Sequence, residues 1–287
     1  MANVADDFKG KVALVTGGGR GLGQGACVEL ATRGAQVAVA DRKAEIAEET
    51  VALCNKAANN DKGAKAFVFD QAKGESVEAC VAEVVAHYGH IDLLFANAGT
   101  GKFVPLVEMK KADWDFIMQV NLNGTFYVCQ EVAKRMIARG KGGKIVLTAS
   151  SGAKVIADQL GAYCASKAAV EMLMKHMAAE LGNYRINVNA ILPGVIETGM
   201  TTPMLRDERM QRMLIRETPV GRWGKPQDVA KLVAFLLSDD ASYINGEGIM
   251  IDGGQTLHGF PRWYALDYTK DNVCNWEERF NEYPYKP

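Results

Sequence analysis

Tyr163, Lys167 and Ser150 have the residue types and spacing of an acid–base site. Tyr163 and Lys167 are four residues apart, so on a helix they share one face and the ammonium lies beside the phenol. The pKa of a free tyrosine is about 10, and a nearby positive charge that lowered it by roughly two to three units would make the phenolate a usable base near neutral pH. Ser150 closes the apolar run 144–149, which places it at the carboxyl end of a predicted strand. A tyrosine base beside a serine hydroxyl suits proton transfer at an alcohol or carbonyl oxygen.

A glycine-rich turn at residues 17–23 follows the first predicted strand, at 11–16. Glycines permit positive φ angles and a close backbone approach, and the helix that follows offers free N–H groups and the positive end of its dipole to a pyrophosphate. The next predicted strand ends in Asp41, where a carboxylate would meet the ribose hydroxyls of a dinucleotide. Strand, loop, helix, strand and acid in this order predict a dinucleotide-binding site.

These motifs resemble those of the short-chain dehydrogenase/reductase family, and the matches are spread over residues 10–254. The loop at 16–23 fits the family's Thr-Gly-x-x-x-Gly-x-Gly pattern, and residues 97–99 fit its Asn-Ala-Gly segment. The other matches are its active-site asparagine at Asn121, its triad at Ser150, Tyr163 and Lys167, the segment with Pro193, Gly194 and Thr198, and the last strand and turn at 245–254.

The resemblance implies an NAD-dependent oxidoreductase that interconverts a secondary alcohol and a ketone by hydride transfer, with Tyr163 as the general acid/base. It also implies that Ser150 hydrogen-bonds the substrate oxygen, that Lys167 lowers the tyrosine pKa and holds the nicotinamide ribose, and that Asn121 positions a water in a proton relay. The implied cofactor-binding residues are Gly17, Arg20, Gly21, Leu22, Gly23, Asp41, Arg42, Asp70, Gln71, Asn97, Ala98, Gly99, Tyr163, Lys167, Pro193, Gly194, Ile196 and Thr198.

The choice of cofactor depends on Asp41, Arg20 and Arg42. A carboxylate at Asp41 would repel the 2′-phosphate of NADP and accept the ribose hydroxyls of NAD. Arginines at the other two positions favour NADP, because a guanidinium fork matches a phosphate. Asp41 weighs more because its charge would lie directly at the hydroxyls, whereas the arginines can turn to solvent. NAD is therefore predicted, with NADP the less favoured cofactor.

Two other functions stay open. One is an NADPH-dependent reductase of a ketone or a 3-ketoacyl group, which runs the same chemical step backwards. The other is a non-catalytic NAD-binding regulator, since a fold does not fix a function; the intact set of Ser150, Tyr163, Lys167 and Asn121 argues against it. For the substrate, a small cyclic or polyhydroxylated secondary alcohol is the hypothesis, and residues 197–219 correspond to the family's substrate lid.

The alternation of apolar runs and helical patterns predicts an α/β fold, a single doubly wound, Rossmann-like sheet of seven parallel strands with a C-terminal aromatic-rich extension. Residues 1–254 form the predicted dinucleotide-binding and catalytic domain. Residues 255–287 carry eight aromatic side chains and are predicted to pack on the same domain or on a neighbouring subunit. The predicted strands lie near 11–16, 36–41, 64–69, 91–96, 144–149, 186–192 and 248–251.

Composition limits the classes of partner, compartment and metal site that are expected for the protein. The net charge is −1 with acids and bases interspersed, which predicts no nucleic-acid or membrane partner. The chain has no apolar stretch of membrane-spanning length, so a cytoplasmic protein is predicted. Six cysteines without Cys-x-x-Cys spacing indicate reduced thiols packed in helices, and no metal site is predicted. The resemblance implies a homotetramer or homodimer.

Overall fold

The computed structural model describes residues 7–60 and 63–257. They form a seven-stranded sheet in the order β3-β2-β1-β4-β5-β6-β7, and every neighbouring pair of strands is parallel. The predicted α/β fold and all seven predicted strands are confirmed. The strands are β1 (Val12–Thr16), β2 (Gln36–Asp41), β3 (Ala64–Val68), β4 (Leu93–Ala96), β5 (Gly143–Thr148), β6 (Ile186–Pro193) and β7 (Gly248–Ile251).

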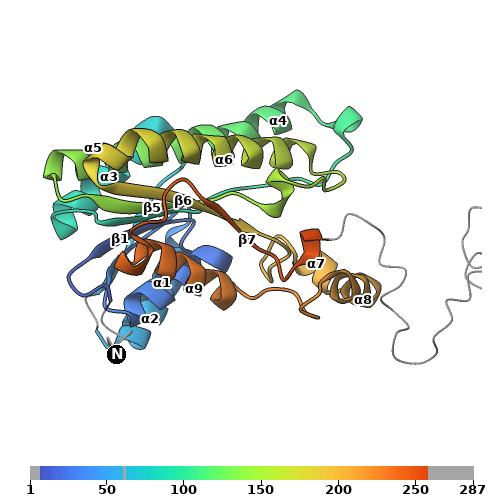
Figure 1. Cartoon of the computed structure of the whole chain (residues 1–287), viewed down its shortest axis with the longest axis horizontal. Coiled ribbons are helices and arrows are strands. Elements are labelled where there is room, and N and C mark those ends of the chain that lie inside the picture. Colours follow the sequence, from blue (N-terminus) through green and yellow to red (C-terminus); the bar gives the residue numbers. More distant parts are fainter. Residues whose placement is uncertain (1–6, 61–62, 258–287) are drawn as a thin grey trace, which may run out of the picture.

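Helices cover both faces of the sheet (Figure 1). One face is covered by α1 (Gly21–Thr32), α2 (Ala44–Ala58) and α9 (Pro226–Leu237). The other is covered by α3 (Gly74–Tyr88), α4 (Lys111–Met118), α5 (Gly124–Arg139) and α6 (Gly161–Leu181). Two short helices, α7 (Thr202–Leu205) and α8 (Glu208–Glu217), lie to one side of the sheet, in the segment that the sequence matched to a substrate lid.

The central strands are apolar along their whole length because both faces of the sheet are buried. In β1 all five residues are buried, and successive side chains point into opposite cores. Leu14 packs in the core under α3, α5 and α6, whereas Ala13 and Val15 pack in the core under α1, α2 and α9. The strand order reverses between β1 and β4, and at such a switch point the loops after the strands leave a crevice for a ligand.

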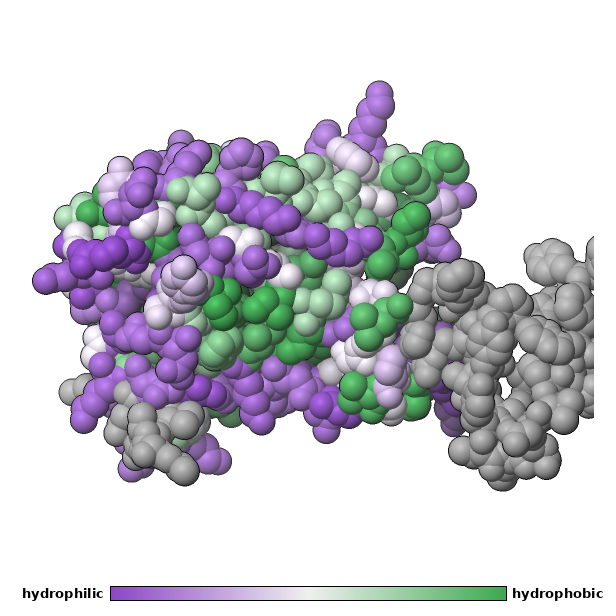
Figure 2. Space-filling view, viewed as in Figure 1, coloured by the Kyte–Doolittle hydropathy of each residue, from purple (hydrophilic) through white to green (hydrophobic). Residues whose placement is uncertain are grey.

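The edge strand β7 and the neighbouring helix α9 leave apolar side chains at the surface. The four residues of β7 are half-buried, and Phe235 of α9 is 39% exposed. Figure 2 shows hydrophobic residues gathered on the face where Figure 1 places these two elements. Surfaces of this kind are commonly covered by a protein partner. The homo-oligomer implied by the sequence stays a prediction.

The described cysteines agree with the sequence interpretation. Cys27, Cys54, Cys80 and Cys129 are buried free thiols and Cys164 is a half-buried one, and each lies in a helix. Cys274 and the extension beyond Leu257 lie outside the described residues, so its packing stays a prediction. Within the described part of the chain, no helix has the length and apolar character needed to span a bilayer.

Candidate active site

The carboxyl ends of the strands open onto two adjoining cavities. The larger, of about 370 Å³, extends from the glycine loop to Tyr163 and Lys167, and the smaller, of about 250 Å³, extends to Asp70 and Gln71. The two share Gly17, Asp41, Ala98 and Gly99. All predicted site residues line one or both cavities except Gly23 and Asn121, which lie directly behind them. Volumes of this size suit an organic cofactor.

The glycine loop has the backbone geometry that a pyrophosphate site requires. Gly17 and Gly21 have φ angles of 62° and 55°, which favour glycine. A Cβ on Gly23 would collide with the carbonyl oxygen of Gly17, so this glycine lets α1 begin tightly against the loop. The first turn of α1 has no acidic residue, and its N-cap residue Arg20 makes no side-chain capping bond. Its free N–H groups and positive dipole end are therefore available to an anion, and the loop fits a dinucleotide.

Asp41 lies where both cavities meet, at the end of β2. Its Oδ2 accepts a hydrogen bond of 3.1 Å from Gly19 N, which ties the carboxylate to the glycine loop. Arg20 and Arg42 also line the cavities and are exposed. The carboxylate is thus held in place, whereas the two guanidinium groups face solvent.

The cavity floor is fixed by hydrogen bonds between strand ends. Asn97 Nδ2 donates to Thr16 O and to Gly17 O, at 3.1 and 3.3 Å, and Thr148 Oγ1 donates to Asn97 Oδ1 at 3.2 Å. These bonds join the ends of β1, β4 and β5. Gln71 Nε2 donates to Ala98 O at 3.1 Å, so its amide holds the cavity wall.

Ser150, Tyr163 and Lys167 converge on the larger cavity, as their spacing predicts. Ser150 follows β5 and caps a short 3-10 helix, where its Oγ accepts from Gly152 N at 3.1 Å. Tyr163 lies in the first turn of α6, and Lys167 lies one turn later. Lys167 Nζ is 5.7 Å from the centroid of the Tyr163 ring and donates a 2.7 Å hydrogen bond to Thr148 O. The i, i+4 pairing therefore places the ammonium near the phenol.

The expected direction of the Tyr163 pKa is wrong for the protein alone. Burial raises the pKa of Tyr163 above its ordinary value, and a hydrogen bond with Ser150 lowers it only in part. The ammonium of Lys167 donates its hydrogen bond to the strand carbonyl and lies over the ring, 5.7 Å from its centroid, and desolvation of the phenol prevails.

Burial lowers the pKa of Lys167 from 10.5 to about 8. Between these values the folded protein holds fewer protons than the unfolded chain, so the contribution of Lys167 to stability rises with pH. Relative to the variant Lys167→Met, the wild type should gain about 2 to 3 kcal/mol in the free energy of unfolding between about pH 7 and pH 10. Urea unfolding at each pH measures this, with Lys175→Met, an exposed lysine of the same helix, as the control. A pH-independent difference between wild type and Lys167→Met would contradict it.

Asn121 lies in a single π-helical turn between α4 and α5 and is fully buried. Its Nδ2 donates to Thr100 O and to Ser166 Oγ, at 2.8 and 3.0 Å, and its Oδ1 accepts from Thr100 N at 2.8 Å. Asn121 thus anchors the loop after β4 to α6. A Cβ on Gly99 would come within 3.3 Å of both Asn121 Oδ1 and Lys167 Nζ. Gly99 therefore packs closely beside both side chains, and a larger residue there would crowd them.

Sequence reasoning missed several residues that line the cavities. Thr148 and Ala149 directly precede Ser150, and residues 199–201 directly follow Thr198, so proximity to a motif was the available signal. The other missed lining residues are Phe69, Thr100, Phe116 and Val120; all but Phe116 are directly adjacent to a predicted site residue. No group of three or more histidine, cysteine or acidic side chains suited to a metal occurs in residues 7–60 and 63–257.

The known proteins that this chain resembles are dehydrogenases and reductases. A family model described as enoyl-(acyl carrier protein) reductase matches residues 17–256. The chain is 40% identical over 257 residues to D-threitol dehydrogenase of Mycolicibacterium smegmatis, covering 88% of this chain and 95% of that protein. It is 38% identical over 252 residues to gluconate 5-dehydrogenase of Gluconobacter oxydans, covering 87% and 96%. The structure of a gluconate 5-dehydrogenase from Burkholderia cenocepacia J2315, in complex with NADP and tartrate, superposes with a TM-score of 0.82 at 36% identity, covering 89% of this chain and 99% of that one.

Proposed function

Since this chain belongs to the short-chain dehydrogenase/reductase family, we propose that it oxidises a small polyhydroxylated secondary alcohol to the ketone with NAD. The observation that carries the proposal is the single cavity in which Ser150, Tyr163 and Lys167 face the glycine loop. A hydride acceptor held along that cavity would lie beside an acid–base pair for the substrate oxygen. The geometry therefore serves alcohol oxidation and, in reverse, ketone reduction.

The protein residues divide the binding of the dinucleotide between them. The N–H groups at the start of α1 would hold the pyrophosphate, and Asp41 would accept the hydroxyls of the adenosine ribose. Lys167 would hold the second ribose, since its ammonium has two further protons to donate beyond the bond to Thr148 O. When bound, oxidised nicotinamide supplies the hydride acceptor and a positive charge near the phenol.

The proposed proton path joins Tyr163 and Lys167 of α6 to Ser150 and Asn121. Ser150 donates to the substrate oxygen while Tyr163, ionised by the surrounding positive charge, takes the hydroxyl proton. Asn121 Oδ1 and Lys167 Nζ both lie beside Gly99, and a water that bound these two groups would pass the proton toward solvent. Asn121 would then hold the relay water with the oxygen that also fixes the loop after β4.

The proposed substrate class rests on the similar dehydrogenases. Gly101 packs against the Tyr163 ring, since a Cβ there would come within 3.2 Å of Tyr163 Cδ2. Threitol and gluconate, from which two of the similar dehydrogenases take their names, are slender polyhydroxylated molecules, and we extend this substrate class to the present chain.

NADPH-dependent reduction of a ketone or a 3-ketoacyl group is the second candidate. It is favoured by the NADP bound in the Burkholderia structure and by the family description that mentions acyl carrier protein. Both candidates use the same residues and differ in the cofactor and in the direction of the reaction. Assays in both directions therefore separate them.

The test of the proposed function is the absorbance of reduced nicotinamide with NAD or NADP and a panel of threitol, gluconate, sorbitol, glycerol and cyclohexanol. We expect NAD reduction that depends on an open-chain polyol and is weak with the cyclic alcohol. Oxidation of NADPH by a 3-ketoacyl thioester is the parallel assay. Faster turnover in that assay than with any alcohol would replace the proposal by the reductase, and no turnover in either would refute both.

A further inference from the structure

A separate cavity of about 430 Å³ lies at the amino ends of the strands, on the edge of the sheet opposite the catalytic residues. It is lined by residues at or next to the starts of β1, β4, β5 and β6 and by the turn after α9. The six-residue strand β5 separates it from Ser150 by roughly 17 Å. Its basic lining residues are Lys11, Lys141, Lys144 and Arg185.

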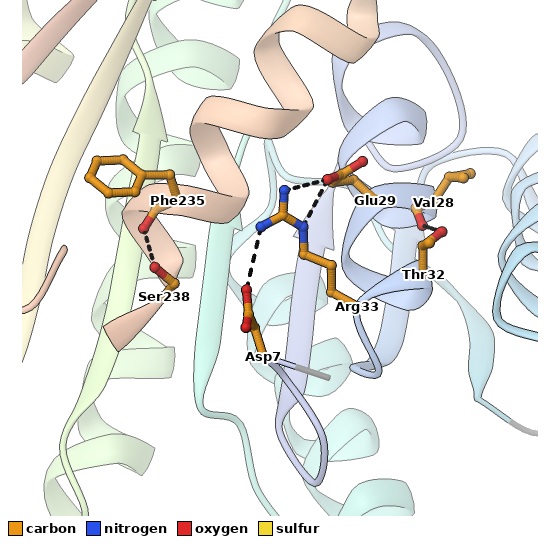
Figure 3. A network of polar contacts seen from close by, with 7 residues as sticks. All are labelled: Asp7, Val28, Glu29, Thr32, Arg33, Phe235 and Ser238. Atoms are coloured by element: carbon orange, nitrogen blue, oxygen red, sulfur yellow. Dashed lines mark hydrogen bonds and ion pairs between the residues drawn. The ribbon is translucent and has the colours of Figure 1, made fainter. Parts of the chain in front are cut away.

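Two of the three acidic lining residues form ion pairs with cations outside the cavity lining. Asp7 forms an ion pair of 3.6 Å with Arg33, which also binds Glu29 (Figure 3). Asp92 pairs with Arg139 and accepts a hydrogen bond of 2.8 Å from Val12 N. Asp239 is the remaining acid of the lining, so the four basic side chains leave the cavity with excess positive charge.

Lys144 is the most unusual member of this cluster, because it is only 8% exposed. Among the described residues, no hydrogen bond or ion pair within 4 Å engages its ammonium. Burial lowers the pKa of Lys144, and the nearby charges of Asp239 and Lys11 act on that pKa in opposite directions. The side chain lines the cavity and its ammonium is not enclosed by protein, so among the described residues it is left available to a ligand there.

A purely structural explanation is that Lys144 stabilises the carboxyl end of α9 through the helix dipole. That end is already capped, since Ser238 N and Oγ both donate to Phe235 O, the latter at 2.7 Å (Figure 3). No hydrogen bond joins Lys144 to a carbonyl of α9 within the described part of the chain. The carboxyl end of α9 therefore does not engage the ammonium that lines the cavity.

We propose that this cavity binds a small phosphate-bearing anion, with Lys144, Lys11 and Lys141 supplying the positive charge. Lysine is a compact point charge that commonly binds phosphate, and a dianion matches the surplus of cations in the lining. The volume admits an anion the size of a small phosphorylated metabolite. Because the ligand lies at the opposite edge of the sheet, it is neither the alcohol nor the dinucleotide.

The test is isothermal titration of inorganic phosphate and of glycerol 3-phosphate into protein saturated with its dinucleotide, at constant ionic strength. Saturation is needed because free phosphate also suits the glycine loop. Lys144→Met should weaken the binding of phosphate at least tenfold, and the matched control Lys134→Met, an exposed lysine on α5, should leave it unchanged. Unchanged dinucleotide affinity in Lys144→Met shows that the variant is folded.

Comparing the two ligands distinguishes a phosphorylated metabolite from free inorganic phosphate as the ligand of the cavity. Tighter binding of glycerol 3-phosphate identifies a phosphorylated metabolite as the ligand class, and equal binding identifies free phosphate; both results support the site. Absence of binding by either ligand, or equal affinity in Lys144→Met and Lys134→Met, would overturn the proposal.

Discussion

Replacing Tyr163 by phenylalanine is expected to lower kcat for alcohol oxidation by about a thousandfold, the usual size of a general acid–base contribution. The variant keeps the ring that packs beside Gly101 and Lys167 and removes only the hydroxyl that bonds Ser150. Tyr163 is one of the implied cofactor-binding residues, but the contacts proposed for the pyrophosphate and both riboses come from other residues, so the dinucleotide affinity should change by less than about twofold. Loss of kcat with unchanged affinity is the signature of a group that acts in the chemical step.

Steady-state kinetics with the best polyol and titration calorimetry with NAD measure the two quantities. Tyr184→Phe is the matched control, because it removes the same hydroxyl outside the active site. Tyr184 is half-exposed on the short helix after α6, at the opposite end of α6 from Tyr163. It should retain wild-type kcat. If Tyr163→Phe kept more than about a tenth of the wild-type kcat, another group would have to transfer the proton.

Local patterns in the sequence were sufficient for the strands and for the arrangement of the main site. Continuous apolar runs such as that of β1 indicate buried parallel strands. The glycine cluster indicates the turn, and in the structure Gly17 and Gly21 have the positive φ angles that favour glycine. The four-residue spacing of Tyr163 and Lys167 fixes their common face once α6 forms. These features depend on residues close together in the chain or on the order of elements.

Features that depend on burial or on distant residues were not predictable in this way. The raised pKa of Tyr163 arises from desolvation by surrounding segments, which no spacing within α6 reveals. The basic cavity joins Lys11, Lys144 and Arg185, which come together only through the register of β1, β5 and β6. Asn121 was singled out correctly, but its bonds to Thr100 and Ser166 required the packed loop. Tertiary packing thus determines the electrostatics of the site.

Asp41→Asn is expected to shift the preference between NAD and NADP toward NADP by about ten- to a hundredfold. Removing one unit charge some 6 Å from a phosphate, at an effective dielectric constant near 20, changes the interaction by about 3 kcal/mol, and each 1.4 kcal/mol is a factor of about ten. Asparagine keeps an oxygen to accept the bond from Gly19 N, so the glycine loop should stay in place. The gain should appear as tighter NADP binding, with NAD binding weakened only by the poorer acceptor.

Calorimetric titration of both dinucleotides into the wild type and the variant gives the ratio of affinities directly. Asp70→Asn is the control, since it removes the same charge from a residue that lines the smaller cavity only, whereas Asp41 lies where both cavities meet. Its ratio should equal that of the wild type. If the wild type already bound NADP more tightly than NAD, then Arg20 and Arg42 would outweigh the carboxylate, and Asp41 would serve mainly to hold the loop through Gly19. In that case the ketone, reduced by NADPH, would be the substrate to seek.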